Sequence, residues 1–202
     1  MTDDGNLTRA ARFDRLYGRD PDPWQVATSP YERAKYQATL DALPRQHYRL
    51  GIEAGCSIGA LSARLAGRCD RLIGLDVSEV ALRLARRHHG ADPRLRFQRA
   101  DLPRDWPQRA AELIVLSEVL YYLDRAEITQ LAGHIARSAP HSDCVLVNYL
   151  GPIPDGLPGA EAAAAFIDAI TGKIAVQNLD ARPGNGYRID IIRLGAPSPG
   201  DP

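Results

Sequence analysis

Short apolar runs alternate with longer amphipathic segments along the chain from residue 49 onward. This alternation is typical of strands and helices that follow one another in a parallel sheet with helices on both faces. The pattern therefore predicts an α/β fold with a single Rossmann-like, seven-stranded, mostly parallel sheet. The expected strands are residues 50–54, 71–76, 95–99, 112–117, 144–149, 174–179 and 187–194. The last two are expected to pair antiparallel, because the connection 180–186 is too short for a crossover helix.

Six helices are expected to cover the sheet. Residues 1–19 carry apolar side chains at helical spacing. Ser29 and Glu32 have the spacing of a capping box, with Pro30 at the first helical position. Ser78 is expected to cap another helix. The six helices are expected at residues 1–19, 29–43, 57–66, 78–90, around 128–135, and 159–170.

Composition places the chain among ordinary soluble domains. It has 202 residues, 45% of them hydrophobic, and a formal net charge of zero. We expect one domain at residues 1–195 and a disordered tail at 196–202. Without a long basic face or an apolar run of roughly 20 residues, neither nucleic acid nor a membrane is an expected partner. The start of the chain is acidic and polar rather than a signal peptide, which predicts a cytoplasmic protein.

The cysteines and histidines show no metal-ligand spacing. Cys56, Cys69 and Cys144 are far apart and form no C-x-x-C pair, so we interpret them as reduced thiols. The histidines form no H-x-x-x-H motif, and two of them end an expected helix, where cations are favourable. No metal is expected.

The first expected strand leads into a loop with two glycines. Gly55 and Gly59 follow Glu53, and the loop is expected to offer free backbone N–H groups at the start of a helix. A dinucleotide loop usually reads G-x-G-x-x-G and holds a phosphate. A carboxylate two residues before the first glycine suits a cationic ligand better. The alternative is an ordinary strand-to-helix turn that carries two glycines.

Acidic residues also follow the next two expected strands. Ligands of open α/β sheets bind at the carboxyl ends of the strands. Asp76 ends the second strand, where a carboxylate can accept hydrogen bonds from both hydroxyls of an adenosine ribose. Asp101 follows the third strand. The alternative for each acid is a helix cap or a loop residue.

The glycine loop resembles motif I of the class I S-adenosylmethionine-dependent methyltransferases. The resemblance implies the class I methyltransferase fold, with S-adenosylmethionine as cofactor and S-adenosylhomocysteine as product. It also implies that Asp101 accepts a hydrogen bond from the adenine amino group. The expected cofactor residues are Glu53, Gly55, Cys56, Ser57, Gly59, Asp76, Val77, Ser78, Asp101, Leu102 and Ser117.

A narrower resemblance rests on the run Leu-Ser-Glu-Val-Leu-Tyr-Tyr-Leu at residues 116–123. Together with segments at 22–24, 29–33, 55–56 and 69–72, it resembles the rhizobial nodulation protein S family over residues 20–150. Members of that family are N-methyltransferases that act on the free amine of a deacetylated glucosamine in a chitooligosaccharide. The resemblance implies a small-molecule acceptor such as an amino sugar or oligosaccharide. A monomer or homodimer is expected.

Glu118 is the expected catalytic residue, because methyl transfer to an amine needs a free lone pair that a carboxylate can orient or deprotonate. The alternative is that Glu118 only caps the following helix and that Tyr121 and Tyr122 belong to the core. Residues 1–45 are expected to form a helical lid, in which Trp24 faces the cofactor and Arg33 or Lys35 pairs with its carboxylate. An O-methyltransferase or a non-catalytic nucleotide-binding protein stays an alternative. The expected acceptor-site residues are Tyr31, Tyr121, Tyr122, Asn148 and Tyr149.

Overall fold

The computed structural model describes residues 7–154 and 156–195, and the expected tail at 196–202 lies outside them. Seven strands form one sheet in the order β3-β2-β1-β4-β5-β7-β6, and β7 runs antiparallel to both of its neighbours. This confirms the predicted sheet and the antiparallel pairing of its last two strands. The strands are β1 (Tyr48–Ala54), β2 (Cys69–Asp76), β3 (Leu95–Arg99), β4 (Leu113–Ser117), β5 (Asp143–Tyr149), β6 (Val176–Pro183) and β7 (Tyr187–Leu194).

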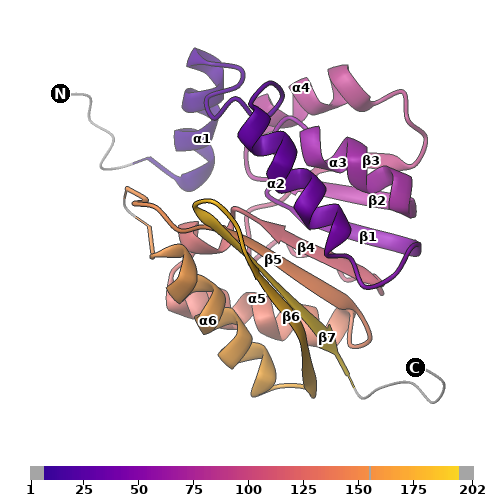
Figure 1. The fold of residues 1–202 in the computed structure, drawn as a ribbon. Coiled ribbons are helices and arrows are strands. Elements are labelled where there is room, and N and C mark those ends of the chain that lie inside the picture. Colours follow the sequence, from indigo (N-terminus) through magenta and orange to yellow (C-terminus); the bar gives the residue numbers. More distant parts are fainter. Residues whose placement is uncertain (1–6, 155, 196–202) are drawn as a thin grey trace.

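Helices pack on both faces of the sheet (Figure 1). One buried apolar cluster joins α5 and α6 to one face, and a second joins α2 and α3 to the other. A third, smaller cluster joins α1 to α4. None of the helices in the described ranges is long and apolar enough to cross a membrane. The helices are α1 (Arg9–Arg19), α2 (Pro30–Asp41), α3 (Ala60–Leu65), α4 (Glu79–His89), α5 (Arg125–Ser138) and α6 (Gly159–Thr171), with short 3₁₀ turns η1 (Ala66–Arg68) and η2 (Leu120–Tyr122).

Two local predictions at helix N-termini were wrong. Ser29 precedes α2 with Pro30 at the first helical position, as predicted, but the Ser29 side chain makes no capping hydrogen bond and the Glu32 carboxylate pairs with Lys35. The helix expected from residue 57 begins only at Ala60, since the glycine loop continues to Gly59. The cap predicted at Ser78 is present, and its side chain accepts a hydrogen bond from the backbone of Ala81.

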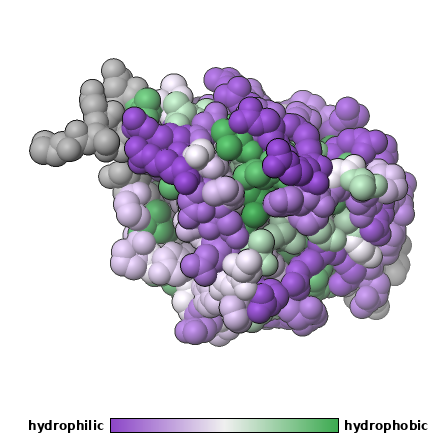
Figure 2. Space-filling view, turned by 90° about the horizontal axis from the view of Figure 1, so that it is seen from above, coloured by the Kyte–Doolittle hydropathy of each residue, from purple (hydrophilic) through white to green (hydrophobic). Residues whose placement is uncertain are grey.

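Helix α1 and the start of α2 lie near the carboxyl ends of the central strands, and α2 then runs along the sheet toward the start of β1 (Figure 1). The face seen from above is largely hydrophilic and carries one central apolar strip (Figure 2). The fold therefore places α1 and the first part of α2 at the edge of the sheet where α/β proteins bind ligands, while the rest of α2 packs on one face.

Candidate active site

A cavity of about 490 Å³ lies between the carboxyl ends of the central strands and the two N-terminal helices. Its size is within the range of small-molecule and cofactor sites. The predicted residues that line it are Trp24, Tyr31, Glu53, Gly55, Cys56, Ser57, Asp76, Val77, Leu102, Ser117, Glu118, Tyr121, Tyr122 and Tyr149. The sheet edge thus brings together residues that lie more than a hundred positions apart in the sequence.

The glycine loop after β1 is fixed by hydrogen bonds to β2. The N–H groups of Gly55 and Cys56 both donate to the Leu75 carbonyl oxygen at 2.9 Å, and the Ser57 N–H donates to Asp76 Oδ2 at 2.9 Å. The expectation of free N–H groups in this part of the loop was therefore wrong. Because these donors are already used, they are not available to bind a phosphate.

Gly55 has a positive φ of 81°. A side chain at this position would collide with the carbonyl oxygen of Ser117 on β4. Gly59 also has a positive φ, of 85°, but a Cβ there would press against His89 and Phe97 rather than enter the cavity. Gly55 therefore lets the loop pass close to β4, whereas Gly59 lets it pack against β3 and α4.

Glu53 and Asp76 present two carboxyl groups to one end of the cavity. Burial raises the pKa of Glu53 to about 7. The hydrogen bond that the Ser62 hydroxyl donates to the Glu53 carboxylate lowers this pKa, and the negative charge of Asp76 raises it further. Burial also raises the pKa of Asp76 to about 6, against hydrogen bonds from the backbone N–H groups of Ser78 and Ser57. Both carboxyl groups therefore ionise at an energetic cost, which a cationic or hydroxyl-bearing ligand would reduce.

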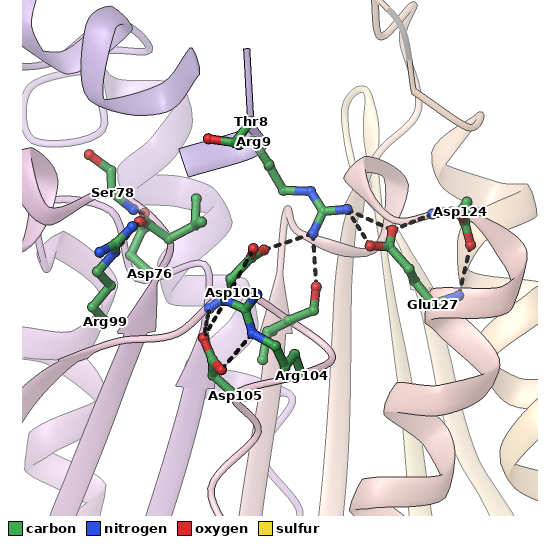
Figure 3. A network of polar contacts seen from close by, with 12 residues as sticks. Thr8, Arg9, Asp76, Ser78, Arg99, Asp101, Arg104, Asp105, Asp124 and Glu127 are labelled. Atoms are coloured by element: carbon green, nitrogen blue, oxygen red, sulfur yellow. Dashed lines mark hydrogen bonds and ion pairs between the residues drawn. The ribbon is translucent and has the colours of Figure 1, made fainter. Parts of the chain in front are cut away.

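Helix α1 is fastened to the ends of three strands. The Tyr17 hydroxyl donates to Ser57 Oγ at 2.6 Å, and the Ser78 hydroxyl donates to Asp14 Oδ1 at 2.6 Å. Arg9 contacts Asp101 Oδ1 at 3.1 Å and Glu127 at 2.6 and 2.7 Å (Figure 3). The helix therefore forms one wall of the cavity, together with the aromatic rings of Phe13 and Tyr17.

Glu118, which follows β4, also lines the cavity. Its Oε1 is 2.8 Å from Lys35 Nζ, and its Oε2 accepts hydrogen bonds from the Tyr121 hydroxyl at 2.5 Å and the Tyr149 backbone N–H at 3.2 Å. The residue has a positive φ of 56°, which is uncommon for a non-glycine residue. Such strained positions occur where surrounding contacts hold a side chain in place.

Five predicted residues do not line the cavity. Arg33 is exposed and donates to the Thr28 carbonyl oxygen, and Gly59 and Ser78 pack against α4. Asp101 is held by Arg9 and by Arg104, which lies 3.5 Å away. Asn148 is 1% exposed on the face of β5 that carries α6.

Several lining residues were not predicted as site residues. Arg9, Glu32 and Lys35 are the charged ones, and only Lys35 was considered, as a partner for the cofactor. Helical spacing predicted that Phe13 and Tyr17 share a helix face, but not that the face borders the cavity. No local motif marks Arg9, because its partners lie 92 and 118 residues away.

The strand order, with β7 antiparallel, and the cavity at the strand ends define a Rossmann-like class I methyltransferase fold. The structure of a putative methyltransferase from Pseudomonas syringae is similar, with 34% identity, a TM-score of 0.66, and coverage of 81% of this chain and 98% of that one. The N-methyltransferase NodS from Bradyrhizobium japonicum WM9, solved with S-adenosyl-L-homocysteine, has 23% identity and a TM-score of 0.77 over 92% of this chain and 97% of that one. The latter likeness supports the fold alone.

The chain belongs to the nodulation protein S (NodS) family, whose family model matches residues 14–138. Nodulation protein S of Rhizobium tropici is 33% identical over 118 residues, which cover 57% of this chain and 50% of that protein. The chain thus spans about half the length of this relative. The predicted family is confirmed.

Proposed function

We propose that the protein is an S-adenosylmethionine-dependent methyltransferase that methylates the amine of a small acceptor, such as an amino sugar or a short oligosaccharide. The observation that carries this proposal is that acidic groups from three neighbouring strands line one cavity. Glu53 lies on β1, Asp76 ends β2 and Glu118 follows β4. The S-adenosyl-L-homocysteine bound to a NodS protein of the same fold supports the choice of cofactor.

The residues present fit S-adenosylmethionine. Glu53 is buried and would pair with the ammonium group of the methionine end, while Asp76 would accept hydrogen bonds from the ribose hydroxyls. Val77 and Leu102 offer apolar contact for the adenine. Asp101 is already held by Arg9, so we assign it to fastening α1 rather than to binding adenine. When bound, the cofactor supplies an electrophilic methyl group on a sulfonium.

The charge of the cavity supports an amine acceptor. Among the residues that the structure describes, the charged ones that line it are four acids, Glu32, Glu53, Asp76 and Glu118, and two bases, Arg9 and Lys35. Both bases are ion-paired with two of the protein's own carboxylates. An acceptor with several carboxylates would therefore be repelled by these acids and would meet two bases that are already ion-paired, whereas an amine gains positive charge as it is methylated and is stabilised here.

Glu118 orients the acceptor rather than removing its proton. Both of its oxygens already accept hydrogen bonds or an ion pair, and three contacts fix the carboxylate in one position. A hydrogen bond from the acceptor amine to this carboxylate would aim the nitrogen lone pair along the cavity. Positioning of this kind supplies much of the acceleration in a one-step displacement.

A nicotinamide-dependent oxidoreductase is the rival enzyme class. Tyr31 and Lys35 do have the Tyr-x-x-x-Lys spacing found in some such enzymes. However, Lys35 is held by two carboxylates, and the first N–H groups of the glycine loop are bonded to β2 rather than available for a pyrophosphate. The loop chemistry therefore favours the methyltransferase.

Transfer of a radiolabelled methyl group from S-adenosylmethionine to glucosamine or to its β-1,4-linked oligomers tests the proposal. Wild-type protein is expected to label the amine, and Glu118→Gln is expected to lower kcat about 10- to 1,000-fold, the range for a lost positioning contact. Glu79→Gln is the matched control, because it removes a surface ion pair with Arg86. Cofactor binding without transfer to any amine would support a non-catalytic binding protein instead.

A further inference from the structure

Lys35 is a buried cation that the methyl-transfer chemistry itself does not require. It is 4% exposed and lies between two carboxylates, with Nζ 2.9 Å from Glu32 Oε1 and 2.8 Å from Glu118 Oε1. Burial lowers the pKa of Lys35, but the charges and hydrogen bonds of Glu118 and Glu32 outweigh this and raise it. The side chain is therefore an ammonium group.

Aromatic side chains enclose this ion-paired triad. Lys35 Nζ lies 5.3 Å from the centre of the Tyr31 ring, and the Tyr121 hydroxyl donates to Glu118. The Tyr31 hydroxyl is buried and has no hydrogen-bond partner among the described residues, although it belongs to the cavity lining. The titratable side chains that interact with the triad include Tyr31 and Tyr36 from α2 and Tyr121 and Tyr122 from η2, and the backbone N–H of Tyr149 also donates to Glu118.

We propose that Lys35 is a positioning residue that fixes the Glu118 carboxylate and sets the charge of the acceptor end of the cavity. The triad of Glu32, Lys35 and Glu118 carries one net negative charge. Without Lys35 it would carry two, and without Glu32 it would carry none. This inference rests on the proposed function, and it makes the amine selectivity of the pocket a property of α2 as well as of Glu118.

The physical consequence concerns the protonation of the acceptor. A doubly negative pocket would bind the ammonium form of the acceptor tightly, but an ammonium has no lone pair and cannot attack the methyl group. A neutral pocket would release the proton easily but bind the amine weakly. One net negative charge is a compromise, in which the ammonium is attracted and the neutral amine is still reached near neutral pH.

Three variants separate this role from simple packing. Lys35→Met removes the positive charge and Glu32→Gln removes one negative charge, so their effects on ammonium binding should have opposite signs. The double variant, Lys35→Met with Glu32→Gln, restores one net negative charge. It also keeps the test valid if Lys35→Met alone is too unstable to fold, because it leaves fewer unpaired buried charges.

The first measurement is the calorimetric affinity of glucosamine for the S-adenosylhomocysteine complex at pH 6.5. Relative to wild type, we expect affinity to rise roughly 5- to 10-fold in Lys35→Met, to fall by a similar factor in Glu32→Gln, and to return in the double variant. N-acetylglucosamine, which carries no charge, should bind all four proteins alike. Thermal unfolding and the affinity for S-adenosylhomocysteine report whether each variant is folded.

The second measurement is the pH profile of methyl transfer. The limb that reports loss of a proton from the bound amine should move to higher pH by about one unit in Lys35→Met and to lower pH in Glu32→Gln. Shifts of the same sign in both variants, or none, would overturn the role of Lys35 while leaving the methyltransferase proposal intact. If wild type binds no glucosamine, the amine acceptor itself is refuted and the inference with it.

Discussion

The guanidinium of Arg9 lies 3.1 Å from the carboxylate of Asp101, and this contact joins helix α1 to the end of β3 across 92 residues of sequence. The same guanidinium donates to the Leu102 carbonyl oxygen at 2.8 Å and to both oxygens of Glu127 at the start of α5 (Figure 3). Glu127 is itself held in the capping box of α5 with Asp124. The Arg9 side chain thus joins α1, which forms one wall of the cavity, to the end of β3 and to the start of α5.

Arg9→Met is expected to speed the dissociation of S-adenosylhomocysteine about 3- to 30-fold. The variant removes charged, partly buried hydrogen bonds that are together worth about 1–2 kcal/mol. Stopped-flow fluorescence of the nearby Trp24 can follow the release. Arg104→Met is the matched control, because Arg104 also contacts Asp101 but is 73% exposed, and its ion pairs are with Asp101 and Asp105, which lie outside α1. Equal release rates for wild type and Arg9→Met would show that Arg9 does not hold the wall closed.

Burial of Glu53 is expected to make the cofactor-free protein less stable as the pH rises. The pKa of Glu53 is raised from 4.5 to about 7, so the unfolded chain ionises this group first. The stability that it contributes is fully present below about pH 4 and is lost as the pH rises through about 7, a loss on the order of 3 kcal/mol. Urea unfolding of wild type and Glu53→Gln at pH 5 and pH 8 measures this. We expect the variant to gain stability relative to wild type at pH 8, and an unchanged difference between the two pH values would contradict the assignment.

Cofactor binding is expected to release protons near pH 6.5. Glu53 and Asp76 are partly protonated in the cofactor-free protein, because their pKa values are raised to about 7 and about 6. A cationic ligand favours their ionised forms, so affinity for S-adenosylmethionine should rise between about pH 5.5 and 7.5. Calorimetry in two buffers with different ionisation enthalpies detects the released protons. In Glu53→Gln the release should shrink and the affinity should fall about 10- to 100-fold.

Gly55→Ala is expected to destabilise the protein by about 2–4 kcal/mol, because alanine disfavours a positive φ and its Cβ would collide with the Ser117 carbonyl oxygen. Gly67→Ala is the matched control, since nothing lies within 4 Å of the position that its Cβ would take. That variant should stay within about 0.5 kcal/mol of wild type or become slightly more stable. Chemical unfolding of both variants tests the pair, and equal stabilities would mean that the loop does not require glycine at 55.

Local rules predicted the fold well. Alternating apolar runs located all seven strands, and β3 begins and ends at the predicted residues. The cap at Ser78 was also found from its residue type, because its hydrogen bond to Ala81 depends only on neighbours in the sequence. Such features follow from periodicity and backbone geometry, which a single segment contains.

Long-range pairs within the site were not predictable in the same way. The capping box expected at Ser29 failed because Glu32 pairs inward with Lys35, which in turn binds Glu118 across 83 residues. Lys35 was considered a partner for the cofactor for the same reason: its sequence neighbourhood does not reveal Glu118. Asp101 was assigned to adenine from the resemblance to the methyltransferases, and nothing near it in the sequence indicates its contact with Arg9.

Calorimetric titration of the wild-type protein with S-adenosylhomocysteine, alongside NAD⁺, tests the central claim most directly. The cavity chemistry predicts binding of S-adenosylhomocysteine with a dissociation constant on the order of micromolar, a free energy of about 8 kcal/mol, and no detectable binding of NAD⁺. Tighter binding of NAD⁺ than of S-adenosylhomocysteine would contradict the account. So would the absence of any heat of binding with S-adenosylhomocysteine at a concentration about a hundredfold above the expected dissociation constant.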